Sequence, residues 1–290
     1  MKDYTLIATA YDKMVRIYVS TSKNLVEEAR KIHSTWPTAT AALGRFLTVS
    51  AMMGLMYKGD ERLTLRIDGD GPIKKMLVEA NAQGEVRATI DNPYVYLKYN
   101  NGKLNVGAAV GNGLLSVTKD LHMKNLFTSS SELQTGEIAE DFTYYFALSE
   151  QTPSSVGLGV LVDTDQSVLA SGGYILQLMP GCPEKTIETI ENIIKDIKPV
   201  STMLNENMTP EDILHLLSNG TEQILDKREI KYYCNSSKEK FRTSLKSLDK
   251  ETLQEIIDED GKAEIICNFC NKKYVFDKEE LLEILASKEK

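Results

Sequence analysis

The sequence predicts an α+β protein with a mixed, largely antiparallel sheet, and three observations support this class. Strand patterns of period two follow one another along the first 179 residues, and helical patterns lie near the ends of that region. After Pro180 the pattern changes to isoleucines at helical spacing, and three of the four cysteines follow residue 230. We therefore expect an N-terminal domain with helices over residues 1–179, a helical linker over 180–229 and a small C-terminal module over 230–290.

Composition and charge exclude several classes of protein. The chain has 290 residues, of which 42% are hydrophobic and 26% charged, as is usual for a globular protein. Its net charge of −8 disfavours nucleic acid and anionic membranes as partners. The N-terminus has no signal-peptide pattern, and the most apolar stretch, residues 46–57, is too short to span a bilayer. We expect a cytoplasmic protein.

The first third of the chain predicts two strands, two helices and then further strands. The second helix begins at Pro37 and continues to about Lys58, and it is apolar nearly all round, which indicates a buried central helix. Ser22 or Asn24 is expected to cap the first helix. The expected ranges are strands at 4–10 and 14–20, helices at 25–30 and 37–58, and strands at 63–67, 73–80 and 85–90.

The middle of the chain predicts two hairpins separated by a helix. Strands at 104–109 and 114–118 flank Gly111-Asn112-Gly113, whose composition suits a hairpin turn better than a phosphate-binding loop. The helix is expected over 138–149, and the second pair of strands over 155–162 and 167–178.

The region after Pro180 predicts two amphipathic helices. The first spans residues 184–198 with its isoleucines in one stripe, and the second is capped by Thr209 and ends at Asn219-Gly220. β-branched residues are mediocre helix formers, so the first helix must lean on a neighbour. These helices are read as a linker that is ordered only while docked; the alternative is that they are two more helices of the first domain.

The C-terminal module predicts three helices and a short hairpin around a small core. Helices are expected over 238–248, after Asp249, and after the capping-box pair Asp277 and Glu280, and strands at 263–266 and 273–276. A core of this size would be marginally stable alone. A bound metal would supply the missing folding free energy.

Cys267-Asn268-Phe269-Cys270 is the strongest chemical signal, because two cysteines two residues apart in a turn can hold one metal ion. Cys234 lies upstream at a distance typical of a second half-site, so we predict a zinc site formed by Cys234, Cys267 and Cys270. Ser236 stands at the fourth ligand position, where it is a doubtful ligand. A thioredoxin-like redox motif is disfavoured, because a strand and not a helix follows the second cysteine.

Other chemistry-bearing residues give weaker signals. Cys182 is isolated in the sequence and is expected to be a lone thiol of no function, and His33, His122 and His215 stand singly and are expected to be structural. The chain shows no nucleophile elbow, zinc-protease motif or Walker lysine. We therefore expect no catalytic residues and no enzyme activity.

Motifs along nearly the whole chain resemble the 33 kDa chaperonin family, the redox-regulated heat-shock chaperones of bacteria. The resemblance includes the cysteine segments and the stretches Thr35-Trp36-Pro37-Thr38-Ala39, Gly69-Asp70-Gly71-Pro72, Gly111-Asn112-Gly113-Leu114, Gly136 to Phe142, Ser149 to Ser154 and Gly172-Gly173-Tyr174-Ile175. It implies a chaperone kept inactive by zinc on four cysteines. Oxidation would then release zinc, form disulfides, unfold the module and linker, and expose apolar surface that binds unfolded client proteins without ATP. The active form is expected to be a homodimer.

Ser236 departs from the family pattern, which has a cysteine there paired with the one matching Cys234. The resemblance therefore implies a redox disulfide between Cys267 and Cys270 but excludes one at 234 and 236. Water, Cys182 or a carboxylate such as Glu239 could provide the fourth ligand of the zinc site, or the fourth position could stay empty. The alternative function is an RNA- or ribosome-binding zinc module, for which Lys272, Lys273 and Tyr274 give a hint of a basic aromatic face. The acidic run at 258–260 weighs against it.

Overall fold

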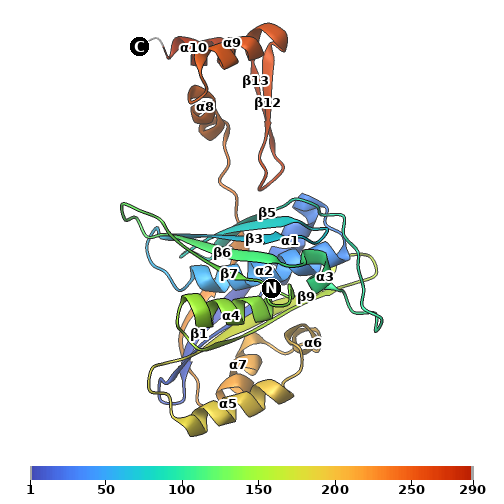
Figure 1. Ribbon diagram of the computed structural model, residues 1–290, viewed down its shortest axis with the longest axis vertical. Coiled ribbons are helices and arrows are strands. Elements are labelled where there is room, and N and C mark those ends of the chain that lie inside the picture. Colours follow the sequence, from blue (N-terminus) through green and yellow to red (C-terminus); the bar gives the residue numbers. More distant parts are fainter. Residues whose placement is uncertain (1, 289–290) are drawn as a thin grey trace. The chain divides into compact units, whose positions relative to one another are not determined.

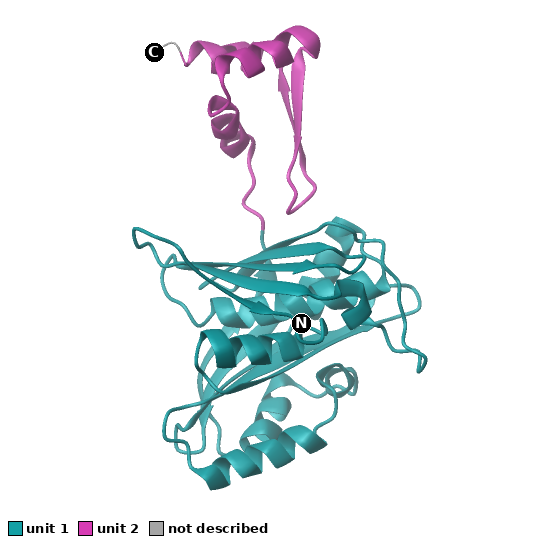
Figure 2. Ribbon diagram, in the orientation of Figure 1, with its two compact units in different colours: residues 1–233 teal, residues 234–290 magenta. Residues whose placement is uncertain are grey.

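The computed structural model describes residues 2–288 and confirms the α+β class. The chain forms two compact units, one that ends at Tyr233 and one that begins at Cys234 (Figures 1 and 2). The first unit contains two sheets. Within the described residues, none of the helices is both long enough and apolar enough to cross a membrane.

The first sheet has five antiparallel strands in the order β10-β1-β2-β9-β8. Its strands are β1 (Tyr4–Ala10), β2 (Val15–Thr21), β8 (Ser154–Val162), β9 (Val168–Leu178) and β10 (Gln223–Glu229). Because β10 and β8 are the two outer strands, each has one side without a neighbouring strand.

The second sheet has six strands in the order β11-β5-β4-β3-β6-β7. Its strands are β3 (Arg62–Gly69), β4 (Lys75–Asn81), β5 (Glu85–Ile90), β6 (Gly113–Asp120), β7 (Phe127–Glu132) and β11 (Lys231–Tyr232). All neighbours are antiparallel except β11 and β5. The last residues of the first unit thus pair with its second sheet.

Helix α2 (Pro37–Gly54) lies between the two sheets and contacts strands of both (Figure 1). Its apolar side chains are buried around the whole circumference, which confirms the predicted central helix. Pro37 occupies the first turn, where its missing N–H costs nothing. Three shorter helices belong to the same layer: α1 (Lys23–His33), α3 (Val106–Val110) and α4 (Ala139–Ser149).

Helices α5 (Glu184–Asp196), α6 (Val200–Asn205) and α7 (Pro210–Ser218) follow β9 and pack on the first sheet. Ile190, Val200 and Leu217 are buried with apolar side chains of β1, β2 and β9. The Thr209 hydroxyl caps α7 by accepting the Asp212 N–H, as its sequence predicts. These helices belong to the compact unit that ends at Tyr233.

One local prediction in the first unit is wrong and another is only partly right. Residues 106–109, expected as part of a strand, belong to α3, because the Asn105 side chain accepts the Ala108 N–H and starts a helical turn. Ser22 is the N-cap residue of α1, as predicted, but its side chain makes no capping hydrogen bond. The Asp3 carboxylate provides one instead, by accepting the Leu25 N–H at 2.7 Å, and it also accepts the Asn24 side-chain amide at 2.9 Å.

The second unit is a two-stranded sheet with three helices, as predicted. Its elements are α8 (Lys238–Lys246), α9 (Lys250–Glu259), β12 (Lys262–Ile266), β13 (Lys273–Asp277) and α10 (Lys278–Ala286). Asp277 and Glu280 form the predicted capping box of α10. In the described part of this unit, only six apolar side chains form the buried core: Leu245, Leu253, Ile257, Phe276, Leu281 and Ile284.

Candidate metal centre

The turn between β12 and β13 fixes the positions of two cysteines. The Cys267 carbonyl oxygen accepts the N–H of Cys270 at 3.3 Å and of Asn271 at 2.8 Å, and the Cys267 N–H donates to the Lys272 carbonyl at 3.0 Å. Asn271 has φ 55°, a left-handed conformation that asparagine tolerates well. The pairing of Ile266 with Lys273 closes the hairpin directly beside this turn. The two sulfurs are therefore held by backbone geometry.

Cys234, at the start of the unit, brings a third sulfur to the same place. The Sγ atoms of Cys234, Cys267 and Cys270 all lie within 4.8 Å of one another, and those of Cys234 and Cys267 are 3.7 Å apart. A tetrahedral zinc ion with Zn–S bonds of about 2.3 Å places its sulfurs about 3.8 Å apart. The donor set and spacing therefore fit zinc.

Ser236 occupies the fourth position beside these sulfurs. Its Oγ lies 3.1 Å from the Cys270 Sγ and 2.9 Å from the Tyr274 hydroxyl oxygen. A neutral hydroxyl is a weaker zinc ligand than a thiolate, since zinc sites are built from thiolate, imidazole or carboxylate. The arrangement thus offers three strong ligands and one weak polar neighbour.

The local environment shifts the pKa values of the Cys234 and Cys270 thiols in opposite directions. Burial raises the pKa of the Cys234 thiol, but hydrogen bonds from the side chain and backbone of Ser236, and from Cys270 and Cys267, lower it to about 7. Burial raises the pKa of Cys270, and its hydrogen bonds with Cys234 and Cys267 act in the same direction. Cys234 is therefore the more readily ionised of the two.

The other residues considered as a fourth ligand lie elsewhere. Cys182 belongs to the first unit and packs against its apolar cluster, where burial raises the pKa of its thiol. Glu239 forms an ion pair with Arg242 at 3.7 Å, and its side chain is exposed. Neither belongs to the cluster of potential ligands found within the described residues. Water or Ser236 remain as candidates for the fourth position.

The single histidines form local pairs in the first unit. The His33 ring lies 3.2 Å from the Tyr232 hydroxyl, and His215 pairs with Glu222 at 2.8 Å. His122 lies in the turn after β6, where its N–H donates to Asp120. No histidine joins a potential metal-binding group in the part of the chain that the structure describes.

Tyr274 also belongs to the candidate metal site, although no sequence motif identifies it as a site residue. Its hydroxyl donates to the Ser236 carbonyl at 2.9 Å and contacts the Ser236 Oγ, while its ring lies 5.0 Å from the Phe241 ring. It thus ties the Cys234 segment to the hairpin that carries the other two cysteines. The only sequence signal was an aromatic residue four positions after Cys270.

Tyr274→Phe is expected to weaken the zinc site while the ring packing against Phe241 persists. Loss of the hydrogen bonds to Ser236 should destabilise the unit by about 1–2 kcal/mol and lower zinc affinity about tenfold. Competition with a chromophoric chelator measures the affinity. Tyr233→Phe is the matched control, since Tyr233 is exposed at the end of the first unit. Equal affinities for the two variants would contradict this role of Tyr274.

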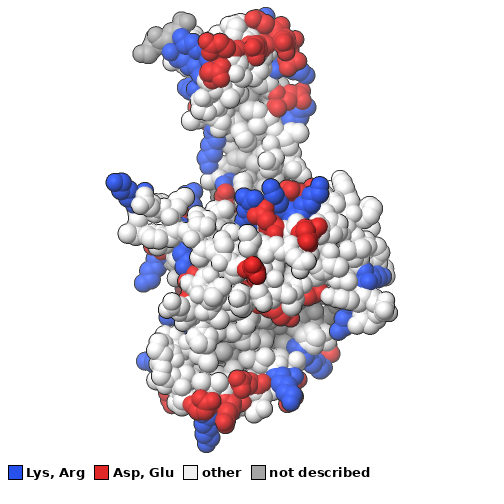
Figure 3. Space-filling view, viewed as in Figure 1, with Lys and Arg blue, Asp and Glu red and all other residues white. Residues whose placement is uncertain are grey.

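Two of the three residues named for a basic aromatic face make other contacts. Lys273 pairs with Glu264, and Tyr274 is engaged with Ser236. In Figure 3, acidic side chains gather over the α9 and α10 end of the second unit, and both basic and acidic side chains are scattered over the visible face of the first. This distribution gives no support to a phosphate-binding surface.

Known proteins match this chain along nearly its whole length. The family model described as "Hsp33 protein" matches residues 3–277. The chain is 58% identical to the 33 kDa chaperonin of Acholeplasma laidlawii over 99% of this chain and 100% of that one. It is 48% identical to the 33 kDa chaperonin of Bacillus subtilis over 96% and 97% of the two chains.

A solved structure confirms the fold. The crystal structure of the 33 kDa chaperonin from Thermotoga maritima matches with a TM-score of 0.92 and 37% identity, covering 99% of both chains. These matches extend over both units, including the cysteine-bearing hairpin. The chain belongs to the 33 kDa chaperonin family, whose members are chaperones.

Proposed function

We propose that the protein is an ATP-independent holdase that protects unfolding proteins from aggregation under oxidative stress, and that thiol oxidation with zinc release activates it. The observation that carries this proposal is the cluster of three sulfurs at zinc-thiolate spacing in a unit with a very small core. Membership of a chaperone family supports the chaperone activity, and the cluster of sulfurs supports its activation by thiol oxidation. We infer that the protein works in the cytoplasm, where thiols stay reduced until oxidants appear.

Zinc bound by Cys234, Cys267 and Cys270 would hold the second unit folded in the reduced state. Thiolates that bind a metal are also targets of peroxide. When one thiolate attacks an oxygen of hydrogen peroxide, an S–O bond forms and the O–O bond breaks; the leaving hydroxide takes up a proton to become water, and a sulfenic acid remains. The second sulfur then displaces the hydroxyl group, which leaves as a second water, and an S–S bond forms. We assign this disulfide to Cys267 and Cys270, and the loss of two thiolates releases the metal.

The helices over residues 180–229 would act as the linker that this switch loosens. In α5 only Ile190 is fully buried, and Ile187, Ile193 and Ile194 are partly exposed. Release of α5 to α7 would expose the apolar side chains of β1, β2 and β9 that they cover. Such a surface suits unfolded clients and a second copy of the chain, so the active form is a homodimer.

Peroxide treatment at mildly elevated temperature is expected to release zinc, consume two thiols and increase suppression of aggregation of a heat-unfolding reporter such as citrate synthase. Zinc release is followed with a chromophoric chelator, and the disulfide is mapped by mass spectrometry of unreduced peptides. Cys182→Ser is the control and should respond like the wild-type chain.

Two results would contradict the proposal in different ways. Oxidised protein that retains zinc and suppresses no aggregation would refute the redox-switched holdase. A disulfide that links Cys234 to Cys267 would leave the holdase intact but refute the assigned pair. Cys270→Ser separates these cases, because it should abolish the assigned disulfide, whereas Cys234→Ser should retain it.

A further inference from the structure

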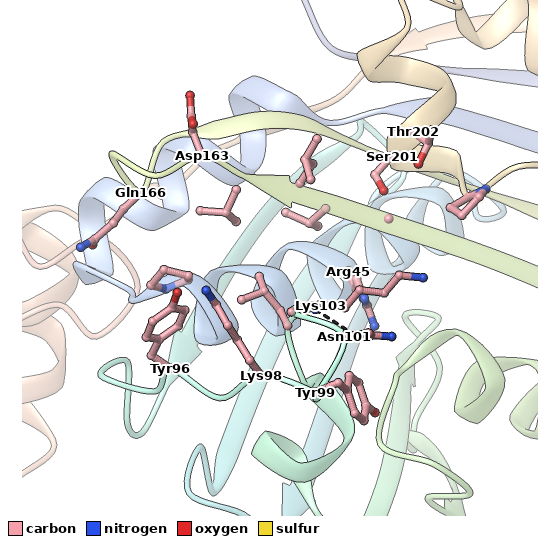
Figure 4. Close-up of a pocket in the computed structure, with 18 of the residues that line it drawn as sticks. Arg45, Tyr96, Lys98, Tyr99, Asn101, Lys103, Asp163, Gln166, Ser201 and Thr202 are labelled. Carbon is pink, nitrogen blue, oxygen red and sulfur yellow. Dashed lines mark hydrogen bonds between the residues drawn. The ribbon is translucent and has the colours of Figure 1, made fainter.

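A cleft of about 950 Å³ opens in the first unit between β8, the loop over residues 96–104 and the start of α6 (Figure 4). Its wall includes every residue from Leu158 to Asp163. Side chains of successive strand residues point to opposite faces of a sheet. A run of consecutive lining residues therefore means that β8 presents its edge to the cleft.

The hydrogen-bond pattern identifies which backbone groups point into the cleft. The Pro153 carbonyl accepts the Leu178 N–H at 2.9 Å, so odd-numbered residues of β8 are the ones hydrogen-bonded to β9. The Val156 N–H donates to the Thr143 hydroxyl of α4 at 3.1 Å, which confirms that even-numbered residues point outward. Leu158 and Val160 therefore direct their N–H and C=O groups toward the cleft, where no partner is found within residues 2–288.

Three cationic residues, Arg45, Lys98 and Lys103, and two acidic residues, Glu137 and Asp163, line the cleft beside this free edge. Lys98 and Lys103 line the cleft, and neither has a carboxylate partner among the described residues. The Lys98 ammonium lies over the Tyr96 ring, 4.8 Å from its centre. Arg45 on α2 binds Glu137 through Nη1, but its Nε is buried without an acceptor. Three cations against two carboxylates give the lining a net charge of +1 in a chain of net charge −8, which favours a ligand segment that carries negative charge.

We propose that the cleft binds an extended, acidic segment of an unfolded client, which adds a strand to the free edge of β8. The N–H and C=O groups of Leu158 and Val160 would pair with the client backbone, and backbone pairing accepts many sequences. Lys98, Lys103 and Arg45 would favour carboxylate side chains. The register shift between Leu161 and Val162 limits the pairing to a short segment. This inference rests on the proposed holdase function and names one of its client-binding surfaces.

The first test measures binding of a fluorescein-labelled, end-capped octapeptide of alternating valine and glutamate to the peroxide-oxidised full chain by fluorescence anisotropy. Two further peptides carry N-methyl groups at all valines or at all glutamates. A strand pairs through alternate N–H groups, and a shift by one residue would exchange the valine and glutamate faces. One methylated peptide should therefore bind at least tenfold more weakly than the other. Equal affinities for both would overturn strand addition.

The second test changes the cleft. Lys98→Glu combined with Lys103→Glu should weaken binding of the unmodified peptide at least tenfold. Lys124→Glu, an exposed lysine outside the cleft, is the matched control and should not weaken it. Val160→Pro removes an outward N–H without removing a bond to β9, and should also weaken binding at least tenfold. Circular dichroism checks that each variant is folded. Wild-type affinity in the double lysine variant would overturn the assignment.

The aggregation assay separates this inference from the proposed function. After oxidation, the double lysine variant should suppress aggregation of citrate synthase less than the Lys124→Glu control does. Equal suppression by both variants would overturn the cleft as a client site while the holdase function stands. If oxidised wild-type protein suppresses no aggregation, the holdase function fails. Peptide binding then decides whether the cleft is a peptide site.

Discussion

Removal of zinc from the reduced protein is expected to unfold the second unit while the two sheets and α2 of the first unit stay folded. A small single core such as the six-residue core of the second unit rarely supplies more than about 3–5 kcal/mol of stability. Structural zinc contributes far more, about 10–16 kcal/mol in small zinc-dependent modules. We expect amide hydrogen-exchange protection over residues 238–286 to fall at least 100-fold after chelation.

The first unit provides an internal reference for this experiment. Its two sheets enclose α2 in an extensive apolar core that contains no cysteine, so the amides of α2 should keep their protection. Cys267→Ser should resemble the chelated protein without any chelator, and Cys182→Ser should resemble the untreated wild type. Full protection of α9 and α10 after complete zinc removal would show that their core suffices, and would contradict the role assigned to the metal.

Elements whose signals are local in sequence were predicted correctly. The apolar circumference of α2, the Thr209 cap and the Asp277–Glu280 capping box each depend on residues within a few positions of one another. The cap of α1 illustrates the opposite case. Asp3 is twenty residues from that helix and reaches it only because β1 and β2 pair, so sequence patterns near α1 identified the N-cap position but not the side chain that caps it.

The edge strand β10 escaped prediction for a related reason. β10 is polar and mostly exposed, so it shows no alternation of buried and exposed side chains, and its pairing with β1 alone makes it a strand. The free edge of β8 was likewise invisible, because it depends on the order of the strands in the sheet. A binding surface that depends on such long-range pairing of strands cannot be predicted from the spacing of residues along the sequence.

The candidate metal site also contains residues that the sequence predicts and residues whose role depends on the fold. The spacing of Cys267 and Cys270 and the presence of Cys234 predicted three residues that the structure brings together. The role of Tyr274 could not be predicted, because its hydroxyl meets Ser236 only through the fold of the hairpin and the path of the chain before α8. The Ser236–Cys270 contact depends on the same arrangement.

Ser236→Cys is expected to raise zinc affinity about 100-fold or more. The Ser236 Oγ already lies 3.1 Å from the Cys270 Sγ, so a sulfur at this position would face the three others with little movement of the backbone. If the free energy of a four-ligand zinc site is shared about equally, one added thiolate contributes about 3 kcal/mol, or about two powers of ten in affinity. Competition with a chelator measures the affinity, and the spectrum of the cobalt-substituted protein reports the change from three thiolates to four.

Ser236→Ala tests what the hydroxyl itself contributes. If water is the fourth ligand in the wild-type chain, this variant should bind zinc with nearly wild-type affinity, and a large loss would identify the serine as a ligand. Ser236→Cys should also change the redox response, because the added thiol can pair with Cys234, so that peroxide consumes four thiols of the unit instead of two. Unchanged zinc affinity and thiol consumption in Ser236→Cys would show that position 236 does not face the metal. The serine would then have no bearing on how tightly the unit holds zinc or how easily oxidation opens it.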